Sequence, residues 1–121
     1  MTASSDTGES NSVASDIPSL TYDANGLIPA IIQDDASGDI LMLGYMDEEA
    51  LRRTLDRDLV TFWSRSRQEY WTKGETSGNV LRLKSIRKDC DVDALLVRAV
   101  PAGPTCHTGA PSCFYRTLQE A

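Results

Sequence analysis

All three cysteines and the only histidine of this 121-residue chain lie between residues 89 and 113. The cysteines are Cys90, Cys106 and Cys113, and His107 directly follows the second of them. Thiolates are preferred ligands of zinc, and three of them leave the fourth position of a tetrahedral ion open, as hydrolytic zinc requires. The odd number of cysteines argues against a disulfide framework. The alternative interpretation is three buried free thiols.

Three aspartates, Asp89, Asp91 and Asp93, alternate around the first cysteine. If this segment is extended, all three lie on one face, where their charges repel one another unless a cation is bound. Magnesium takes carboxylate ligands and keeps several waters, so it is the predicted ion. A solvent-facing acidic strand end is the alternative. Strict alternation would point Cys90 to the opposite face, so either the backbone is irregular here or the two metals lie apart.

The position of His107 next to Cys106 bears on its role. As a fourth zinc ligand, His107 would close the site and make it structural. Neighbouring residues rarely reach one metal together, so the adjacency favours water as the fourth ligand and His107 as a proton-transfer group near neutral pH. A surface or core histidine with no catalytic role is the alternative.

The charge distribution adds a candidate binding surface. The net charge of −6 speaks against nonspecific nucleic-acid binding. Residues 61–88 nevertheless hold seven bases against two acids. Arginine and lysine here are candidates to clamp the phosphates of a small substrate, or else form a solvated strand face. The seven bases are Arg65, Arg67, Lys73, Arg82, Lys84, Arg87 and Lys88.

The elements that must position these residues are short. Apolar runs at 28–33 and 40–46 flank a glycine-containing turn and predict a β-hairpin. Asp47, followed by Glu48 and Glu49, predicts the start of a helix over 47–57. Further strands are predicted at 59–64, 80–87 and 94–100, with a last short one at 113–118. Residues 68–73 fit either a helix or a strand. The predicted class is α+β, a mostly antiparallel sheet with one or two helices.

One domain over residues 19–121 is expected, preceded by a disordered tail over residues 1–18 that holds few large apolar side chains. The tail lacks the basic and apolar regions of a secretory signal. No apolar run is long enough to span a bilayer. A cytoplasmic protein without membrane or nucleic-acid partners is therefore expected.

The motifs of the chain, taken together and in order, resemble those of the phosphoribosyl-AMP cyclohydrolase family, which acts in histidine biosynthesis. The resemblance covers about residues 28–116. It is carried by the strings YMDEEAL (45–51), WSRSR (63–67), WTKGETSG (71–78), DCDVD (89–93), CHTG (106–109) and SCF (112–114), with QD (33–34) and LM (41–42) before them.

The resemblance implies a metal-dependent hydrolase that opens the N1–C6 bond of the adenine ring of phosphoribosyl-AMP. It implies a homodimer in which zinc, one ion per subunit, is bound by Cys90, Cys106 and Cys113 drawn from two subunits. Magnesium would be held by Asp89, Asp91 and Asp93, and His107 would transfer protons. The implied substrate contacts are Trp63, Arg65, Arg67, Lys73, Glu75 and Ser77.

Two other interpretations use the same residues. Zinc deaminases attack the same type of carbon, but they need a His-x-Glu…Pro-Cys-x-x-Cys pattern that this sequence lacks. A non-enzymatic, zinc-stabilised binding module would use a closed Cys₃His site. Replacing His107 separates the module from the enzyme, because only in the module would it release zinc.

Overall fold

The computed structural model describes residues 16–121 of the chain, and residues 1–15 lie outside the described part. Most of the predicted tail of residues 1–18 therefore falls outside it. At the end of that segment, Ile17 and Pro18 open a short 3₁₀ helix, and the Ile17 side chain is only 2% exposed. The elements in order are η1 (Ile17–Ser19), β1 (Ile28–Asp34), β2 (Ile40–Met46), α2 (Glu48–Arg57), β3 (Thr61–Ser64), β4 (Glu69–Thr72), β5 (Leu81–Lys88) and β6 (Leu95–Pro101).

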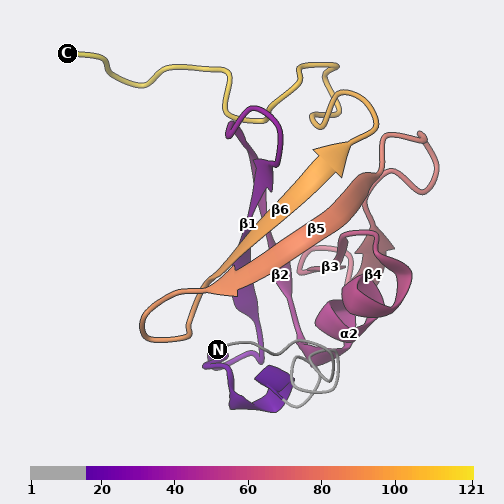
Figure 1. Cartoon of the computed structure of the whole chain (residues 1–121), viewed down its shortest axis with the longest axis vertical. Coiled ribbons are helices and arrows are strands. Elements are labelled where there is room, and N and C mark those ends of the chain that lie inside the picture. The colour runs from indigo at the N-terminus through magenta and orange to yellow at the C-terminus, as the bar shows by residue number, and fades with distance from the viewer. Residues whose placement is uncertain (1–15) are drawn as a thin grey trace.

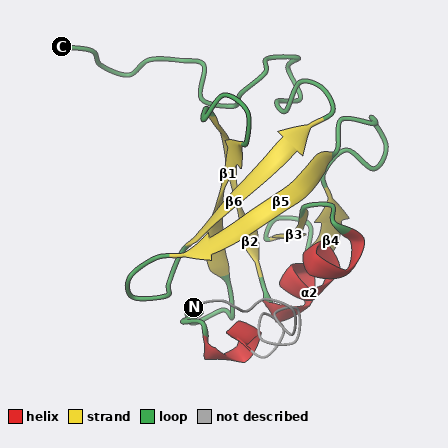
Figure 2. Cartoon of the chain, viewed as in Figure 1, coloured by secondary structure: helices red, strands yellow, loops and turns green. Residues whose placement is uncertain are grey.

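Two sheets organise the chain. Four strands form a mixed sheet in the order β2-β1-β6-β5, and β3 and β4 form a separate antiparallel pair beside α2 (Figures 1 and 2). Every pairing is antiparallel except that of β1 with β6. The α+β class with one α-helix and mostly antiparallel strands is thus confirmed. The parallel β1–β6 pair was not predicted, and the homodimer stays a prediction.

The local predictions at the start of the domain are confirmed. The predicted hairpin is β1 and β2, paired in register from Ile28 with Met46. The predicted helix is α2, and its N-cap is Asp47, whose Oδ1 accepts a hydrogen bond from the Ala50 amide at 2.8 Å. Asp58 ends the helix in the left-handed region, with φ of 58°. In the part of the chain from residue 16 onward, no helix has the length and apolar character to cross a membrane.

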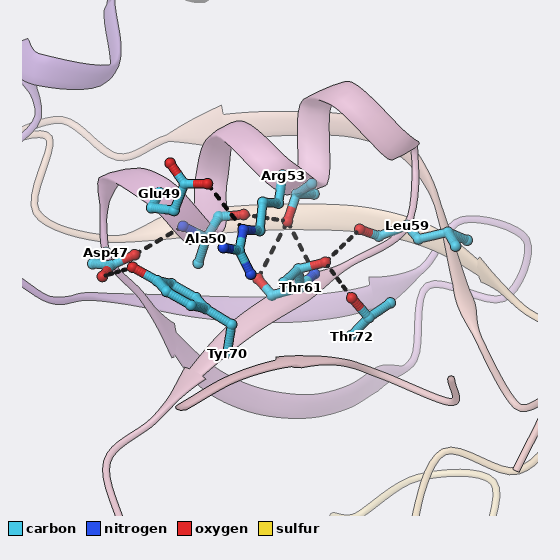
Figure 3. Close-up of polar contacts among 9 residues, drawn as sticks. Asp47, Glu49, Ala50, Arg53, Leu59, Thr61, Tyr70 and Thr72 are labelled. Carbon is cyan, nitrogen blue, oxygen red and sulfur yellow. Dashed lines mark hydrogen bonds and ion pairs between the residues drawn. The ribbon is translucent and has the colours of Figure 1, made fainter. Parts of the chain in front are cut away.

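Hydrogen bonds fix α2 to the β3–β4 pair (Figure 3). The Thr54 hydroxyl on α2 accepts from the Thr61 amide at 2.9 Å and donates to the Ala50 carbonyl at 2.9 Å. The Thr61 and Thr72 hydroxyls lie 2.9 Å apart across the pair. These groups are buried, so leaving any of them unpaired would be costly. The helix therefore fixes the orientation of the hairpin that carries residues 63–67.

The core lies where the four-stranded sheet meets α2, β3 and η1. Gly44 on β2 shows how closely the layers approach, since a Cβ there would lie 2.5 Å from Cδ1 of Phe62. Only glycine lets β2 pack directly on this ring. The large apolar side chains that are fully buried in this core are Ile17, Ile28, Ile32, Met46, Val60, Phe62, Leu81, Leu95 and Val97.

Two other strand predictions are resolved by the structure. The ambiguous segment 68–73 contains strand β4, paired with β3. The predicted last strand at 113–118 is wrong, because this segment has no ladder of backbone pairs. It is attached at its start, where the Cys113 amide donates to the Leu41 carbonyl at 2.8 Å. Phe114 and Leu118 are 63% and 102% exposed, so apolar composition here does not reflect burial in a sheet.

Candidate metal centre and active site

The three aspartates lie in the tight turn that joins β5 to β6. The Asp89 carboxylate organises this turn, since its Oδ1 accepts the amides of Asp93 at 2.9 Å and Ala94 at 3.2 Å. Val92 adopts a left-handed conformation with φ of 55°. The segment is therefore not extended, and of the two alternatives left open by the sequence the irregular backbone is the one observed. The carboxylates converge because the chain turns around Asp89, and the alternation of residues is incidental.

Ligand oxygens of the three carboxylates all lie within 4.8 Å of one another, and all three side chains are exposed. Hydrogen bonds with Asp91 and Asp89 raise the pKa of Asp93 to about 6. Partial desolvation acts to raise the pKa of Asp89. The hydrogen bonds that the Asp89 carboxylate accepts from Asp93 and Ala94 outweigh this effect, so the pKa of Asp89 lies below its usual value. The cluster thus shares a proton near pH 6. A hard divalent cation would replace that proton and relieve the repulsion, so the donor set fits magnesium.

Two of the three cysteines meet in the irregular segment that follows β6. Cys106 begins a turn closed by a hydrogen bond of 2.9 Å from the Gly109 amide to its carbonyl. The Cys113 amide is held by Leu41 on β2, which brings the Cys113 thiol close enough to Cys106 for each to shift the pKa of the other. The start of β2 and the turn at 106–109 together position this thiol pair.

The two thiols differ in acidity. The Thr108 hydroxyl donates to the Cys106 sulfur at 3.1 Å, and this hydrogen bond is the main cause of a lowered Cys106 pKa. Burial, followed by the hydrogen bond with Cys106, raises the pKa of Cys113. The Lys73 ammonium lowers both pKa values as a smaller effect. Cys106 is therefore the more acidic thiol of the pair, and zinc would displace the thiol protons, as thiolate ligation requires.

Cys90 does not join this pair in one chain. It lies in the aspartate turn, at the opposite end of β6 from the segment that carries the thiol pair (Figure 1). The seven residues of β6 span about 20 Å at the usual rise of a strand. Cys90 is exposed. A single copy of the chain thus offers two converging thiols at one end of the sheet and a third thiol at the other.

His107 is the second residue of the turn that begins at Cys106, and its side chain is exposed. The imidazole is therefore accessible to a molecule bound beside the thiol pair. Its role in proton transfer stays a prediction.

A groove runs between β2 and the β3–β4 pair. Trp63 stands edge-on to Tyr70, with ring centroids 4.9 Å apart, and the Arg65 guanidinium lies 3.9 Å from the centre of the Tyr45 ring. The groove has an aromatic floor and a basic rim, a combination suited to a nucleotide. Its lining residues are Met42, Leu43, Gly44, Tyr45, Phe62, Trp63, Ser64, Arg65, Ser66, Arg67 and Trp71.

The predicted basic contacts are differently engaged. Arg65 has no carboxylate within 4.0 Å among residues 16–121, whereas Arg67 forms an exposed ion pair of 3.5 Å with Glu69. Lys73 is half-buried, and its Nζ lies 5.8 Å from the centre of the Trp71 ring. Trp71 also lines the groove, and the charge of Lys73 acts on both thiols, so Lys73 links the groove to the thiol pair.

Two other predicted substrate contacts, Glu75 and Ser77, form hydrogen bonds within or next to the 74–79 loop that contains them. The Glu75 carboxylate accepts from the Thr72 amide at 3.2 Å, and the Ser77 hydroxyl accepts from the Asn79 amide at 3.2 Å. Both side chains stabilise the 74–79 loop that follows Lys73. Contact with a substrate stays a prediction for these residues.

The sequence predictions gave no role to Tyr45 or to Trp71, although both occur in the motifs at 45–51 and 71–78. The structure brings them into the groove from β2 and β4. Their signal was present as aromatic residues within two motifs, but periodicity alone could not distinguish a groove side chain from a core one.

Comparison with known proteins gives a consistent result. The family profile described as "Phosphoribosyl-AMP cyclohydrolase" matches residues 42–115, more than half of the chain. A protein named phosphoribosyl-AMP cyclohydrolase from Cereibacter sphaeroides (strain KD131 / KCTC 12085) is 56% identical over 108 residues, which cover 89% of this chain and 91% of that protein. One of the same name from Paracoccus denitrificans (strain Pd 1222) is 56% identical over 105 residues, or 87% of each.

Longer proteins match as well. The "Histidine biosynthesis bifunctional protein HisIE" of Photobacterium profundum is 64% identical over 90 residues, which are 74% of this chain and 44% of that protein. The chain thus spans less than half of this bifunctional relative and nearly all of the single-function relatives.

Proposed function

The chain belongs to the phosphoribosyl-AMP cyclohydrolase family, and from that premise we propose that it hydrolyses the N1–C6 bond of phosphoribosyl-AMP in a metal-dependent reaction of histidine biosynthesis. The observation that carries the proposal is that Lys73, whose charge acts on both thiols of the Cys106–Cys113 pair, lies 5.8 Å from the ring centre of Trp71, which lines the aromatic, basic groove. Hydrolysis adds water across the bond, with the oxygen going to C6 and a proton to N1. The residues must therefore bind a nucleotide, activate water and move protons.

Zinc is proposed to bind the thiols. The donor set fits this metal, because two cysteines already approach each other and the pKa of one of them is lowered. Zinc would supply the Lewis acidity that makes water nucleophilic near neutral pH. Magnesium is proposed at Asp89, Asp91 and Asp93, where it would supply a positive charge for phosphate oxygens.

The third zinc ligand is proposed to be Cys90 of a second copy of the chain. One chain keeps Cys90 at the far end of β6, which supports the expectation that two copies complete each site. The aspartate turn holds Cys90, so the same association would bring magnesium beside zinc. Metal binding and dimerisation would then stabilise each other.

The remaining roles go to residues of one chain. His107, exposed beside Cys106, is proposed to take a proton from the attacking water or to deliver one to N1. Lys73 is proposed to balance charge near the thiols, and Arg65 to bind phosphate in the groove. Trp63 and Trp71 would bind the flat parts of the nucleotide.

The direct test is an ultraviolet-monitored turnover assay with phosphoribosyl-AMP on protein supplied with zinc and magnesium. We expect ring opening that a chelator abolishes and that zinc restores. Protein that holds stoichiometric zinc and yet shows no turnover would contradict the proposal and favour a structural zinc module.

A further inference from the structure

We propose that Tyr45 is a positioning residue that holds the Arg65 guanidinium at the groove, so that Arg65 anchors a phosphate group of the nucleotide. This inference rests on the proposed function and deepens it, because it assigns one end of the groove to phosphate and names the side chain that prepares it. Tyr45 itself needs no contact with the substrate.

The backbone around Arg65 is fixed by its turn. The Gln68 amide donates to the Ser64 carbonyl at 2.8 Å, and the Gln68 side-chain amide donates to the Arg65 carbonyl at 2.8 Å. The Arg65 side chain is exposed, so without a partner its rotamers would be free. The Tyr45 ring, 3.9 Å from the guanidinium carbon, supplies that partner from the neighbouring strand β2.

Stacking on a ring leaves the chemistry of the arginine intact. The guanidinium carbon lies 3.9 Å from the ring centre, and contact through the guanidinium face leaves its N–H donors, which lie in its plane, pointing outward. Those donors match the oxygens of a phosphate in a bidentate arrangement. Because Arg65 has no ion pair among the described residues, its charge is available, in contrast to that of Arg67 beside Glu69.

Strand β2 sets the distance between the phosphate end and the thiol end. The Leu41 carbonyl of β2 holds the amide of Cys113, and Tyr45 of the same strand holds Arg65. Leu41 and Tyr45 are four residues apart, which is about 13 Å along the strand at its usual rise per residue. Phe62, Trp63 and Trp71 line the groove along this stretch. A nucleotide with its phosphate at Arg65 can therefore extend its base toward the thiols.

The test measures binding of AMP and of adenosine, which differ only in the phosphate, by isothermal titration. Tyr45→Leu, which removes the ring, is expected to weaken AMP binding about fivefold, while Tyr45→Phe, which keeps the ring, stays within about twofold of wild type. Arg65→Met is expected to weaken AMP binding about tenfold. Adenosine binding should be unchanged in all three. The double variant that combines Tyr45→Leu with Arg65→Met should bind AMP no more weakly than Arg65→Met alone, because Tyr45 acts through Arg65.

Arg53 offers a matched control. Its guanidinium lies 4.1 Å from the centre of the Tyr70 ring, but it is paired with Glu49 at 2.9 Å and does not line the groove. Arg53→Met should leave AMP binding unchanged. In kinetics with phosphoribosyl-AMP, Tyr45→Leu should raise KM about fivefold and leave kcat within about twofold.

The failures of the two proposals are distinguishable. No turnover by the metal-loaded wild type would contradict the proposed function. The AMP binding measurements would still test the positioning role of Tyr45 in that case. Equal AMP affinity of wild type and Tyr45→Leu would overturn the positioning role, as would additive losses in the double variant. If Tyr45→Leu does not fold, the Nε–Hε proton of Arg65 in wild-type NMR spectra is decisive. Its chemical shift should be displaced by the Tyr45 ring current and should change when AMP, but not adenosine, is added. A proton that shows neither the ring-current shift nor the change with AMP would contradict the proposal.

Discussion

The two candidate metal sites of this chain are built in opposite ways. The aspartate cluster is complete within five consecutive residues, because the turn around Asp89 itself brings the carboxylates together. The thiol pair draws on the segment after β6 and on β2 through Leu41, and its proposed third ligand is a cysteine that one chain holds at the other end of its sheet. One site is local, and the other is proposed to require assembly.

The difference predicts different consequences of damage. A local site forms whenever its turn forms, so its loss should affect cation binding and leave the assembly alone. A site divided between copies links metal, association and activity in one equilibrium.

Cys106→Ser removes a proposed zinc ligand and its effect should be the largest. We expect turnover to fall at least about a thousandfold, because the nucleophile is no longer activated. Metal analysis should show loss of zinc, and ultracentrifugation should show weakened association. Magnesium binding at the aspartate turn should persist. Full zinc content in this variant would contradict the ligand assignment.

His107→Asn tests whether the exposed histidine acts on protons or on zinc. Turnover is expected to fall by about 10²–10⁴-fold, the usual contribution of a general acid or base. Zinc content and the thermal unfolding midpoint should match wild type, since no ligand or core contact is lost. If zinc is released in this variant, the site is a closed Cys₃His centre and the catalytic role of His107 is wrong.

Asp91→Asn and Asp89→Ala separate ligand from scaffold within the local site. Asp91→Asn should weaken magnesium binding and lower turnover by about tenfold at limiting magnesium, with recovery at high magnesium. Its thermal midpoint should not fall, because it removes a repulsive charge. Asp89→Ala should lower the midpoint as well, because the amides of Asp93 and Ala94 lose their acceptor. Equal midpoints for the two variants would refute the scaffold role of Asp89.

The pH dependence of magnesium binding should be the smallest effect. The pKa of Asp93 is raised to about 6, so below this pH the metal-free cluster holds a proton that magnesium must displace. Affinity should therefore fall about tenfold between pH 7 and pH 5. Calorimetry in two buffers of different ionisation enthalpy should show proton release near pH 6. Asp93→Asn should bind more weakly but lose this dependence, and an unchanged slope would contradict the assignment.

Local sequence signals predicted much of this fold. The hairpin at β1 and β2 and the capped helix α2 depend on neighbouring residues such as Asp47, and both are present. The parallel pairing of β1 with β6 joins segments more than 60 residues apart, and no local pattern encodes it. The apolar residues at 113–118 predicted a strand, but no free strand edge pairs with them, and Phe114 is exposed.

The candidate site shows the same division. Residue types predicted the aspartates and cysteines as metal ligands, and the aspartates do converge. The alternating pattern left an extended and an irregular backbone open, because hydrogen bonds to Asp89 and the positive φ of Val92 are not visible in such a pattern. Tyr45 received no role because its stacking on Arg65 depends on how β2 meets the β3–β4 pair. The roles of side chains that act through tertiary contacts cannot be predicted from the spacing of residues in the sequence.

Mixing two inactive variants tests the central claim most directly. Cys90→Ser and Cys106→Ser chains are each expected to lack activity, and co-refolding equal amounts with zinc should restore about a quarter of the wild-type rate, since half of the dimers are mixed and each holds one intact site. Restored activity would establish that Cys90 and Cys106 of different copies form one site. No recovery, in mixed dimers that are shown to form, would contradict a thiol site completed between two copies.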